Sequence, residues 1–390
     1  MREYLLVFLA AAVVSYLLCV VARELAMRTG AVAEVRDRDV HAVPIPYFGG
    51  VAMLGGLGAG FLVAHHLPFL SRSQPAVFHD AGVVLIGGAI ICAVGVLDDL
   101  LELDALTKLG GQVVAAGFLV VNNVQLFSLR VPGVGQWVLD PTQAMIISVV
   151  LVVGTVNAIN FVDGLDGLAG GMVAIGAVAF FVFSYRLADV NGYTLAITAA
   201  LLCACLGGAC VGFLPHNFFP ARIFMGDSGS MLLGLVLSGS ALALTGQFAG
   251  VQLNQTGDFD AGGSLVILLP VLLPISILVV PFLDLVLAVV RRTRRGQMFY
   301  HPDKQHLHHR LLEFGHSQRV AVLIMWLWAG LVAFGAVLVS LYASVLSILV
   351  TVVWAVVTLA LTFALPRLQR PGHGPASPAP AAAPAPGPGR

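Results

Sequence analysis

The chain is dominated by apolar runs that are long enough to cross the roughly 30 Å hydrocarbon layer of a bilayer. Hydrophobic residues make up 58% of its 390 residues and charged residues only 10%, which leaves too little polar surface to coat a soluble globule. Continuous apolar runs predict helices, because a membrane barrel would need short strands of alternating polarity. We therefore predict an all-α polytopic integral membrane protein with about eleven transmembrane helices. The predicted spans are residues 4–22, 47–66, 81–97, 109–127, 143–159, 168–185, 193–214, 229–248, 264–290, 320–341 and 344–364.

The Lys and Arg residues predict how these spans are oriented. If the spans alternate in direction, one set of loops holds sixteen basic residues and the other set holds only four, which are Arg2, Arg72, Arg130 and Arg186. Basic residues accumulate in cytoplasmic loops, so the N-terminus is predicted outside and the C-terminus in the cytoplasm. Residues 1–366 then form a single transmembrane catalytic domain, and residues 367–390, rich in Pro and Ala, form a disordered cytoplasmic tail.

Charge and cysteine content exclude other classes of protein. The formal net charge is zero, whereas binding to nucleic acid usually requires a basic surface. The five Cys residues lie in apolar stretches, and the cluster at 203–210 has no nearby His to complete a metal site. All five are therefore predicted to be packing residues rather than zinc ligands or disulfide partners.

Four polar motifs collect in the loops that are predicted to be cytoplasmic. They are the Asp98 and Asp99 pair, residues 157–168 (NAINFVDGLDGL), residues 216–230 (HNFFPARIFMGDSGS) and residues 301–311 (HPDKQHLHHRL). A transporter or flippase would instead place ionisable groups near the bilayer midplane, along a path across it. The one-sided distribution favours an enzyme at the cytoplasmic face, with a transporter or flippase as the alternative.

Five carboxylates stand at the ends of helices that must pack together. They are Asp98, Asp99, Asp163, Asp166 and Asp227. Close like charges would raise one another's pKa, and a bound Mg²⁺ ion, with Mn²⁺ as a second choice, would relieve the repulsion. For any single Asp the alternative is a helix cap or a turn.

A dense group of His residues lies beside basic side chains in the last motif. His306, His308 and His309 share this segment with Lys304 and Arg310. Zinc binding is the alternative, but the segment has neither an HExxH pattern nor a nearby Cys. His and Arg donors beside a carboxylate-bound Mg²⁺ suit the developing charge of a diphosphate.

Two further features lie within the predicted spans. The glycine-rich residues 49–60 and 110–117 follow no strand, so they are predicted to permit close helix packing rather than to cradle phosphate. Asp284 lies roughly 10 Å below the basic residues that follow it at 291–295, so its carboxylate must face protein. It is predicted either to form a structural ion pair or to orient a basic side chain toward the substrate.

The ordered set of motifs resembles the polyprenyl-phosphate N-acetylhexosamine-1-phosphate transferase family, also called glycosyltransferase family 4. The resemblance runs from about residue 36 to 312, through RDRDVHAVPIPYFGG, the Asp pair with KLGGQ, and the motifs above. It implies Mg²⁺-dependent transfer of a sugar-1-phosphate from a UDP-sugar to polyprenyl phosphate, with release of UMP. It also implies a multi-pass protein of the bacterial plasma membrane, surrounded by membrane lipids, with a cytoplasmic active site and no nucleic-acid partner.

The resemblance also implies roles for individual residues. Asp98, Asp99, Asp227, His308 and His309 correspond to catalytic positions, with Asp227 and Asp99 as the metal ligands. Substrate-binding positions correspond to Lys108, Asn157, Asn160, Asp163, Asn217, Phe224, His306 and Arg310. Among these, Asp163, Asn217 and Phe224 line the uridine pocket in the family.

Two departures from the pentapeptide-carrying branch of the family indicate the sugar. That branch usually has a Lys where this chain has Glu102, and three consecutive His residues where this chain inserts Leu307. UDP-GlcNAc is therefore the predicted donor, with UDP-MurNAc-pentapeptide and UDP-GalNAc as alternatives. The Arg-rich composition resembles actinobacterial proteins, which implies decaprenyl phosphate as the acceptor, with undecaprenyl phosphate as the alternative. Monomer and homodimer stay open.

Overall fold

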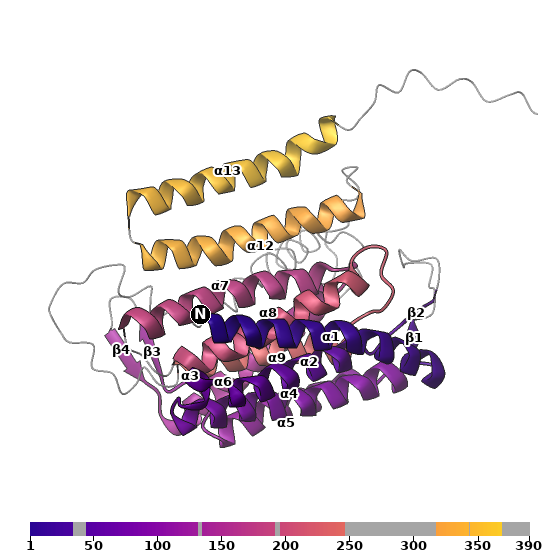
Figure 1. The fold of residues 1–390 in the computed structure, drawn as a ribbon, viewed down its shortest axis with the longest axis horizontal. Coiled ribbons are helices and arrows are strands. Elements are labelled where there is room, and N and C mark those ends of the chain that lie inside the picture. Colours follow the sequence, from indigo (N-terminus) through magenta and orange to yellow (C-terminus); the bar gives the residue numbers. More distant parts are fainter. Residues whose placement is uncertain (34–43, 132–134, 192–195, 246–316, 343, 369–390) are drawn as a thin grey trace, which may run out of the picture.

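The computed structural model describes residues 1–33, 44–131, 135–191, 196–245, 317–342 and 344–368. Figure 1 shows a bundle of long helices that lie side by side and run alternately in opposite directions. The long helices are α1 (Arg2–Thr29), α2 (Gly49–His66), α4 (Pro75–Leu101), α5 (Ala105–Val121), α6 (Pro141–Val162), α7 (Leu168–Asn191), α8 (Ala196–Asn217), α9 (Gly226–Thr245), α12 (Gln318–Leu341) and α13 (Val345–Leu368).

The described helices confirm the all-α fold class. Eight of them are long and apolar enough to cross a membrane, and α5 is a shorter apolar helix. Every predicted span except 264–290, which lies outside the described residues, overlaps one of the long helices. The number of spans and their orientation in a bilayer stay predictions.

Two boundaries differ from the predictions. The predicted span 109–127 ends early, because α5 stops at Val121 and Asn123 adopts the left-handed conformation at φ 65°. Near the C-terminus, α13 continues to Leu368, two residues beyond the predicted domain boundary at residue 366. Residues 369–390 lie outside the described part of the chain.

Short elements occupy the ends of the bundle. The four-residue helix α3 (Pro68–Ser71) follows α2, and its first turn is held by Glu3, which accepts hydrogen bonds from the backbone N–H groups of Phe69 and Leu70 at 2.8 and 2.9 Å. Two small antiparallel ladders accompany it, β1 (Val32–Ala33) with β2 (Ile45–Pro46) and β3 (Ser128–Val131) with β4 (Gly135–Val138). These ladders lie at opposite ends of the bundle (Figure 1).

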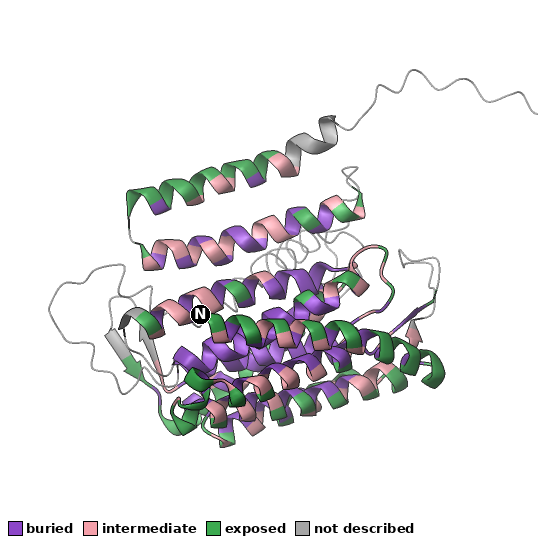
Figure 2. Cartoon of the chain, in the orientation of Figure 1, coloured by how far each residue is buried: buried purple, intermediate pink, exposed green. Residues whose placement is uncertain are grey.

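Helix α9 forms the centre of the bundle. Figure 2 shows buried residues concentrated in the inner helices and exposed residues along α13 and the outer faces of α1 and α5. The most apolar 18-residue window of α9 is entirely buried, and its mean hydropathy of 1.5 is the lowest among the eight candidate spans. The hydroxyls of Ser238, Ser240 and Thr245 donate hydrogen bonds to carbonyl oxygens one turn earlier in the same helix, at 2.6–2.8 Å. A sheltered position among other helices explains why α9 tolerates so many small and polar residues.

Close packing around α9 depends on glycine. Backbone N–H groups of Gly49 and Gly50, at the start of α2, donate to the carbonyl oxygens of Phe224 and Met225 at 3.0 Å each. A Cβ on Gly50 would lie 2.2 Å from the backbone nitrogen of Gly229 in α9. The predicted packing role is therefore confirmed for most of the first glycine-rich run and for Gly111 of the second, where an added Cβ would lie 2.6 Å from the Val94 side chain. At Gly58, Gly110 and Gly117 no described atom lies within 4 Å of an added Cβ, so the described residues show no close packing there.

Candidate active site

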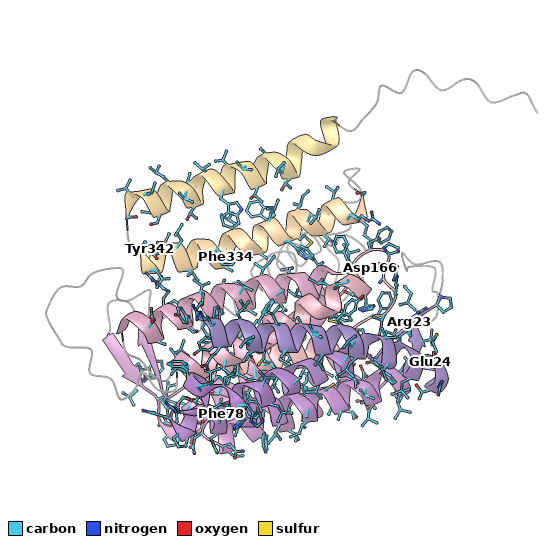
Figure 3. The ribbon with its side chains drawn as sticks, in the orientation of Figure 1. Arg23, Glu24, Phe78, Asp166, Phe334 and Tyr342 are labelled. Carbon is cyan, nitrogen blue, oxygen red and sulfur yellow. The ribbon has the colours of Figure 1, made fainter. Side chains whose placement is uncertain are left out.

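Polar side chains from four helices meet at one end of the bundle. Figure 3 places Asp166 at the same end as Arg23 and Glu24, and Phe78 and Tyr342 at the opposite end. Helices α4 and α6 end on the side of Asp166, and α5 and α9 begin there. This arrangement brings together residues that the sequence separates by more than a hundred positions.

Lys108 connects two carboxylates at this end. Its ammonium group lies 2.9 Å from Oδ2 of Asp98 and also donates to Oδ2 of Asp227. Lys108 is in the first turn of α5, whose N-terminus is capped by Asp104 through hydrogen bonds from Leu106 N–H and Thr107 N–H at 3.0 Å. The cap fixes where α5 begins, and it thereby directs the Lys108 side chain between α4 and α9.

Asp227 is held on its other side by α6. The Asn160 amide donates to Oδ1 of Asp227 and, at 2.9 Å, to the hydroxyl of Ser230 one turn further along α9. Both oxygens of the Asp227 carboxylate therefore have a donor, one from α5 and one from α6. Ser230 was not among the predicted site residues, although its spacing of three from Asp227 on a helix places both on one face.

Asp99 has a different position from its neighbour Asp98. Its carboxylate accepts hydrogen bonds from the backbone N–H of Asp227 at 2.8 Å and of Ser228 at 3.3 Å. An anion at the N-terminus of a helix satisfies free N–H groups and interacts favourably with the helix dipole. Asp99 thus orients the first turn of α9, and with it Asp227, in addition to any role toward a metal ion.

A second polar layer lies one turn deeper in the bundle. Gln112, four residues after Lys108 in α5, is 1% exposed and accepts a 2.6 Å hydrogen bond from the amide of Asn157. Asn157 is three residues before Asn160 in α6, so the same two helices contribute to both layers. Gln112 ends the KLGGQ motif that begins at Lys108, but it was not predicted as a site residue. Its helical spacing from Lys108 is the signal that could have identified it.

Two loops complete this end of the bundle, and we call them the α6–α7 loop (residues 163–167) and the α8–α9 loop (residues 218–225). Asn217 is 2% exposed and joins them, because its Oδ1 accepts from Gly167 N–H at 2.9 Å and its Nδ2 donates to Ile223 O at 3.0 Å. Asp166 adds a second link by accepting a 2.9 Å hydrogen bond from Ala221 N–H. Phe224 is half-buried, with its ring 6.3 Å from that of Tyr47.

Asp163 stands where α6 enters its loop. It is half-buried, and burial together with the nearby carboxylates of Asp227 and Asp99 raises its pKa to about 8. A carboxyl group in such surroundings holds its proton at neutral pH unless a cation comes close. The raised pKa of Asp163 shows that it lies close to the other carboxylates of this end of the bundle.

Two carboxylates at this end of the bundle could serve as ligands of Mg²⁺. Within the described residues no group of three or more His, Cys, Asp or Glu side chains is arranged to hold a metal ion. Mg²⁺ typically takes only one or two protein carboxylates and completes its shell with water and substrate phosphate. Asp227 and Asp98, whose oxygens converge on one ammonium group, could supply two such ligands.

Some predicted residues fall outside the described part of the chain. They are His306, His308, His309, Arg310 and Asp284, and their roles stay predictions. The structure brings Asp98, Lys108, Asn160 and Asp227 into direct contact, and it places Asp99, Asp163 and Asn157 beside them.

The fold and this site define a multi-pass membrane protein that gathers carboxylates, a Lys ammonium group and an Asn amide at one end of its helix bundle. Residues 81–245 match the family model described as Glycosyl transferase family 4. The chain is 44% identical over 375 residues to the decaprenyl-phosphate N-acetylglucosaminephosphotransferase of Mycobacterium tuberculosis, covering 95% of this chain and 90% of that protein. The protein of the same name from Mycolicibacterium smegmatis is 44% identical over 383 residues, with 97% and 92% covered.

A more distant relative carries a different sugar in its name. The phospho-N-acetylmuramoyl-pentapeptide-transferase of Mycobacterium bovis is 29% identical over 288 residues, covering 65% of this chain and 80% of that protein. The chain belongs to glycosyl transferase family 4, and it is a membrane-bound transferase.

Proposed function

We propose that this protein transfers GlcNAc-1-phosphate from UDP-GlcNAc to a polyprenyl phosphate, with decaprenyl phosphate as the acceptor in its own cell. An oxygen of the lipid phosphate attacks the β-phosphorus of the donor, and the bond from that phosphorus to the bridging oxygen breaks. The products are UMP and polyprenyl-diphospho-GlcNAc, the first lipid-linked intermediate of a cell-wall polymer. The single observation that supports this best is the contact among Asp98, Lys108, Asn160 and Asp227, in a chain 44% identical along almost its whole length to decaprenyl-phosphate N-acetylglucosaminephosphotransferases.

The protein groups are suited to positioning and charge stabilisation, which are the main requirements of phosphoryl transfer. Asp227, with Asp98 or Asp99, would hold Mg²⁺, which supplies positive charge to the phosphate of departing UMP. Lys108 is close enough to both carboxylates to donate to a phosphate oxygen bound between them. Asn160 keeps the Asp227 carboxylate in place through its amide.

Asp98 has two candidate roles in this reaction. A phosphate monoester has a second pKa near 6, so the lipid phosphate is already largely dianionic at neutral pH and needs little help from a base. Asp98 either removes the residual proton or attacks the donor itself to form an aspartyl phosphate. Rapid acid quench with β-³²P-labelled donor distinguishes the two, because only the second route leaves label on the protein.

We also propose that the end of the bundle that carries Asp98 and Asp227 faces the cytoplasm of a bacterial cell, where UDP-sugars are made. The asymmetric distribution of Lys and Arg residues supports this orientation. In that orientation the donor arrives from the aqueous side, and the prenyl chain of the acceptor stays in the bilayer.

The test is a comparison of donors with the purified full-length protein in nanodiscs. UDP-GlcNAc, UDP-GalNAc and UDP-MurNAc-pentapeptide are each supplied with decaprenyl phosphate, and UMP release and lipid-linked product are measured with Mg²⁺, with Mn²⁺ and after chelation by EDTA. We expect turnover with UDP-GlcNAc that stops in EDTA and returns with Mg²⁺. Preference for another donor would change the assigned sugar, and transport of a lipid-linked sugar without UMP release would support a flippase instead.

A further inference from the structure

Helix α12 contacts the candidate site from outside the segment 81–245 that the family model matches. The indole N–H of Trp326 donates to the carbonyl oxygen of Leu168, the first residue of α7, at 3.3 Å. The ring of Trp326 also lies 5.6 Å from that of Phe218, the first residue of the α8–α9 loop. Trp326 therefore contacts the residue that follows the α6–α7 loop and the first residue of the α8–α9 loop.

A second side chain of α12 makes a similar contact nearer the end of the bundle. The Arg319 Nε donates to the carbonyl oxygen of Phe219 at 3.2 Å, and its guanidinium lies 5.7 Å from the centre of the Phe219 ring. Arg319 is exposed, so this contact forms at the surface rather than in the core. Trp326 and Arg319 lie seven residues apart, which places them on the same face of α12, two turns from each other.

The packing of Trp326 depends on Gly171 in α7. A Cβ at that position would lie 1.9–2.3 Å from three atoms of the indole, so any side chain there would displace the ring. The Trp326 ring therefore packs directly against the backbone of the first two turns of α7, next to the α6–α7 loop. We call Trp326, Arg319 and Gly171 the α12 brace.

The α8–α9 loop leads directly to Asp227, yet Asp227 and its neighbours are also held by contacts with α2 and α4. The backbone N–H of Asp227 donates to the Asp99 carboxylate. The carbonyl oxygen of Met225 accepts a 3.0 Å hydrogen bond from the backbone N–H of Gly50. Neither contact involves α12. Loosening the brace should therefore disturb the loops more than it disturbs Asp227.

We propose that Trp326 and Arg319 are positioning residues that hold the α6–α7 and α8–α9 loops in the conformation that binds the nucleotide part of the donor. This inference rests on the proposed function. In the proposed orientation these loops lie at the cytoplasmic end of the helices, where the soluble donor arrives, and the reacting carboxylates are anchored separately. Loss of the brace should raise the KM for UDP-GlcNAc and leave kcat nearly unchanged.

The experiment combines hydrogen exchange with kinetics on the full-length protein. The variants are Trp326→Ala, Arg319→Ala and Gly171→Ala, where the last displaces the indole while leaving it in the sequence. The matched control is Trp328→Ala, because Trp328 lies two residues further along α12 and donates its own indole N–H to Thr362 of α13 at 3.2 Å. It removes the same kind of contact from the opposite side of the helix.

Hydrogen exchange tests the brace without any substrate. Peptides that contain Gly167 and Ala221, whose N–H groups bond to Asn217 and Asp166, should exchange about tenfold faster in the brace variants than in the wild type, since loss of one hydrogen bond and one ring contact corresponds to roughly that factor. The peptide that begins at Asp227 should be unchanged. Unchanged exchange in all three variants, or equal acceleration in Trp328→Ala, would overturn the inference.

Kinetics tests the assignment to the donor nucleotide. The KM for UDP-GlcNAc and the Kd for UMP should rise about tenfold in Trp326→Ala and less in Arg319→Ala, with kcat within about twofold, because one lost contact of this size changes a binding constant by roughly that factor. Arg319→Lys should restore part of the loss. Faster exchange with unchanged KM and Kd would overturn the positioning role, whereas a wild type inactive with every UDP-sugar would overturn the proposed function and leave the exchange result standing.

Discussion

Gly95 controls how closely α4 approaches the start of α9. A Cβ built on Gly95 would lie 2.4 Å from the backbone nitrogen and Cα of Ser228 and 2.6 Å from the carbonyl carbon of Asp227. Non-bonded carbon atoms prefer a separation of about 3.5–4.0 Å, so a methyl group here would push the two helices about 1 Å apart. The atoms it meets belong to the backbone, so they cannot turn away as a flexible side chain could.

This separation would act directly on the site. Asp99, one turn after Gly95 in α4, accepts a hydrogen bond from Asp227 N–H at 2.8 Å. An increase of about 1 Å takes that contact beyond the roughly 3.2 Å limit of N–H···O bonds, so the first turn of α9 loses its cap. Misplacement of a reacting group by about 1 Å can slow an enzyme about a hundredfold. We therefore expect Gly95→Ala to lower kcat by about two orders of magnitude.

The assay is the initial rate of UMP release at saturating UDP-GlcNAc and decaprenyl phosphate, with thermal unfolding in detergent measured in parallel. Gly82→Ala is the matched control, because it lies in the same helix and its Cβ would make an ordinary contact of 3.8 Å with Phe61. Gly50→Ala should reproduce the loss from the α2 side, where the Cβ would lie 2.2 Å from Gly229 N. A wild-type kcat in Gly95→Ala, or an equal loss in Gly82→Ala, would refute the reasoning.

Three further predictions concern the metal, the pH dependence and the topology. Asp227→Asn should keep the fold but lower Mg²⁺-dependent turnover by about two orders of magnitude or more; near-normal activity across a Mg²⁺ titration would contradict Asp227 as a metal ligand. The pKa of Asp163 is raised to about 8, so between about pH 4 and pH 8 the folded protein keeps a proton that the unfolded chain releases, and stability falls as pH rises. Asp163→Asn cannot ionise, so its Tm advantage over the wild type should grow from pH 5 to pH 8.5, and a constant difference would exclude this cause. Because the native Cys residues are buried, single probes at Leu106→Cys and Arg72→Cys should be labelled by a membrane-impermeant maleimide from opposite sides of the membrane, and labelling of both from one side would contradict the topology.

Most of the described fold could be predicted from hydropathy, because lipid leaves helices as the only way to satisfy the backbone of a continuous apolar run. Hydropathy could not reveal which helix is central. The least apolar span, α9, is the most buried, because a helix surrounded by protein needs no lipid-facing surface. Nor could glycine content alone separate Gly50, which touches the backbone of another helix, from Gly117, which has no described atom within 4 Å of an added Cβ.

The site was predictable as a set of residues but not as a set of contacts. The Asp residues and Lys108 were found because charged groups are rare in this chain and fall at helix ends. The separate positions of Asp98 and Asp99 depend on the rotation of α4 against α9, which a sequence does not specify. Asn217 is predicted to lie beside the nucleotide, and the hydrogen bonds of its amide to the backbone of both loops could not be read from the sequence.

The burial of α9 has a consequence for how the protein is made. Its first turn carries Asp227 together with backbone groups that depend on Asp99 of α4, and its remaining length is surrounded by other helices. A helix with these properties is poorly stabilised while its only neighbours are lipid chains, and it becomes secure once the helices around it have assembled. During biogenesis, α4 and α6 are synthesised before α9 and can receive it as it leaves the translocon. The carboxylate centre is therefore completed only when α9 brings Asp227 to the Asp98, Lys108 and Asn160 side chains of the helices made before it.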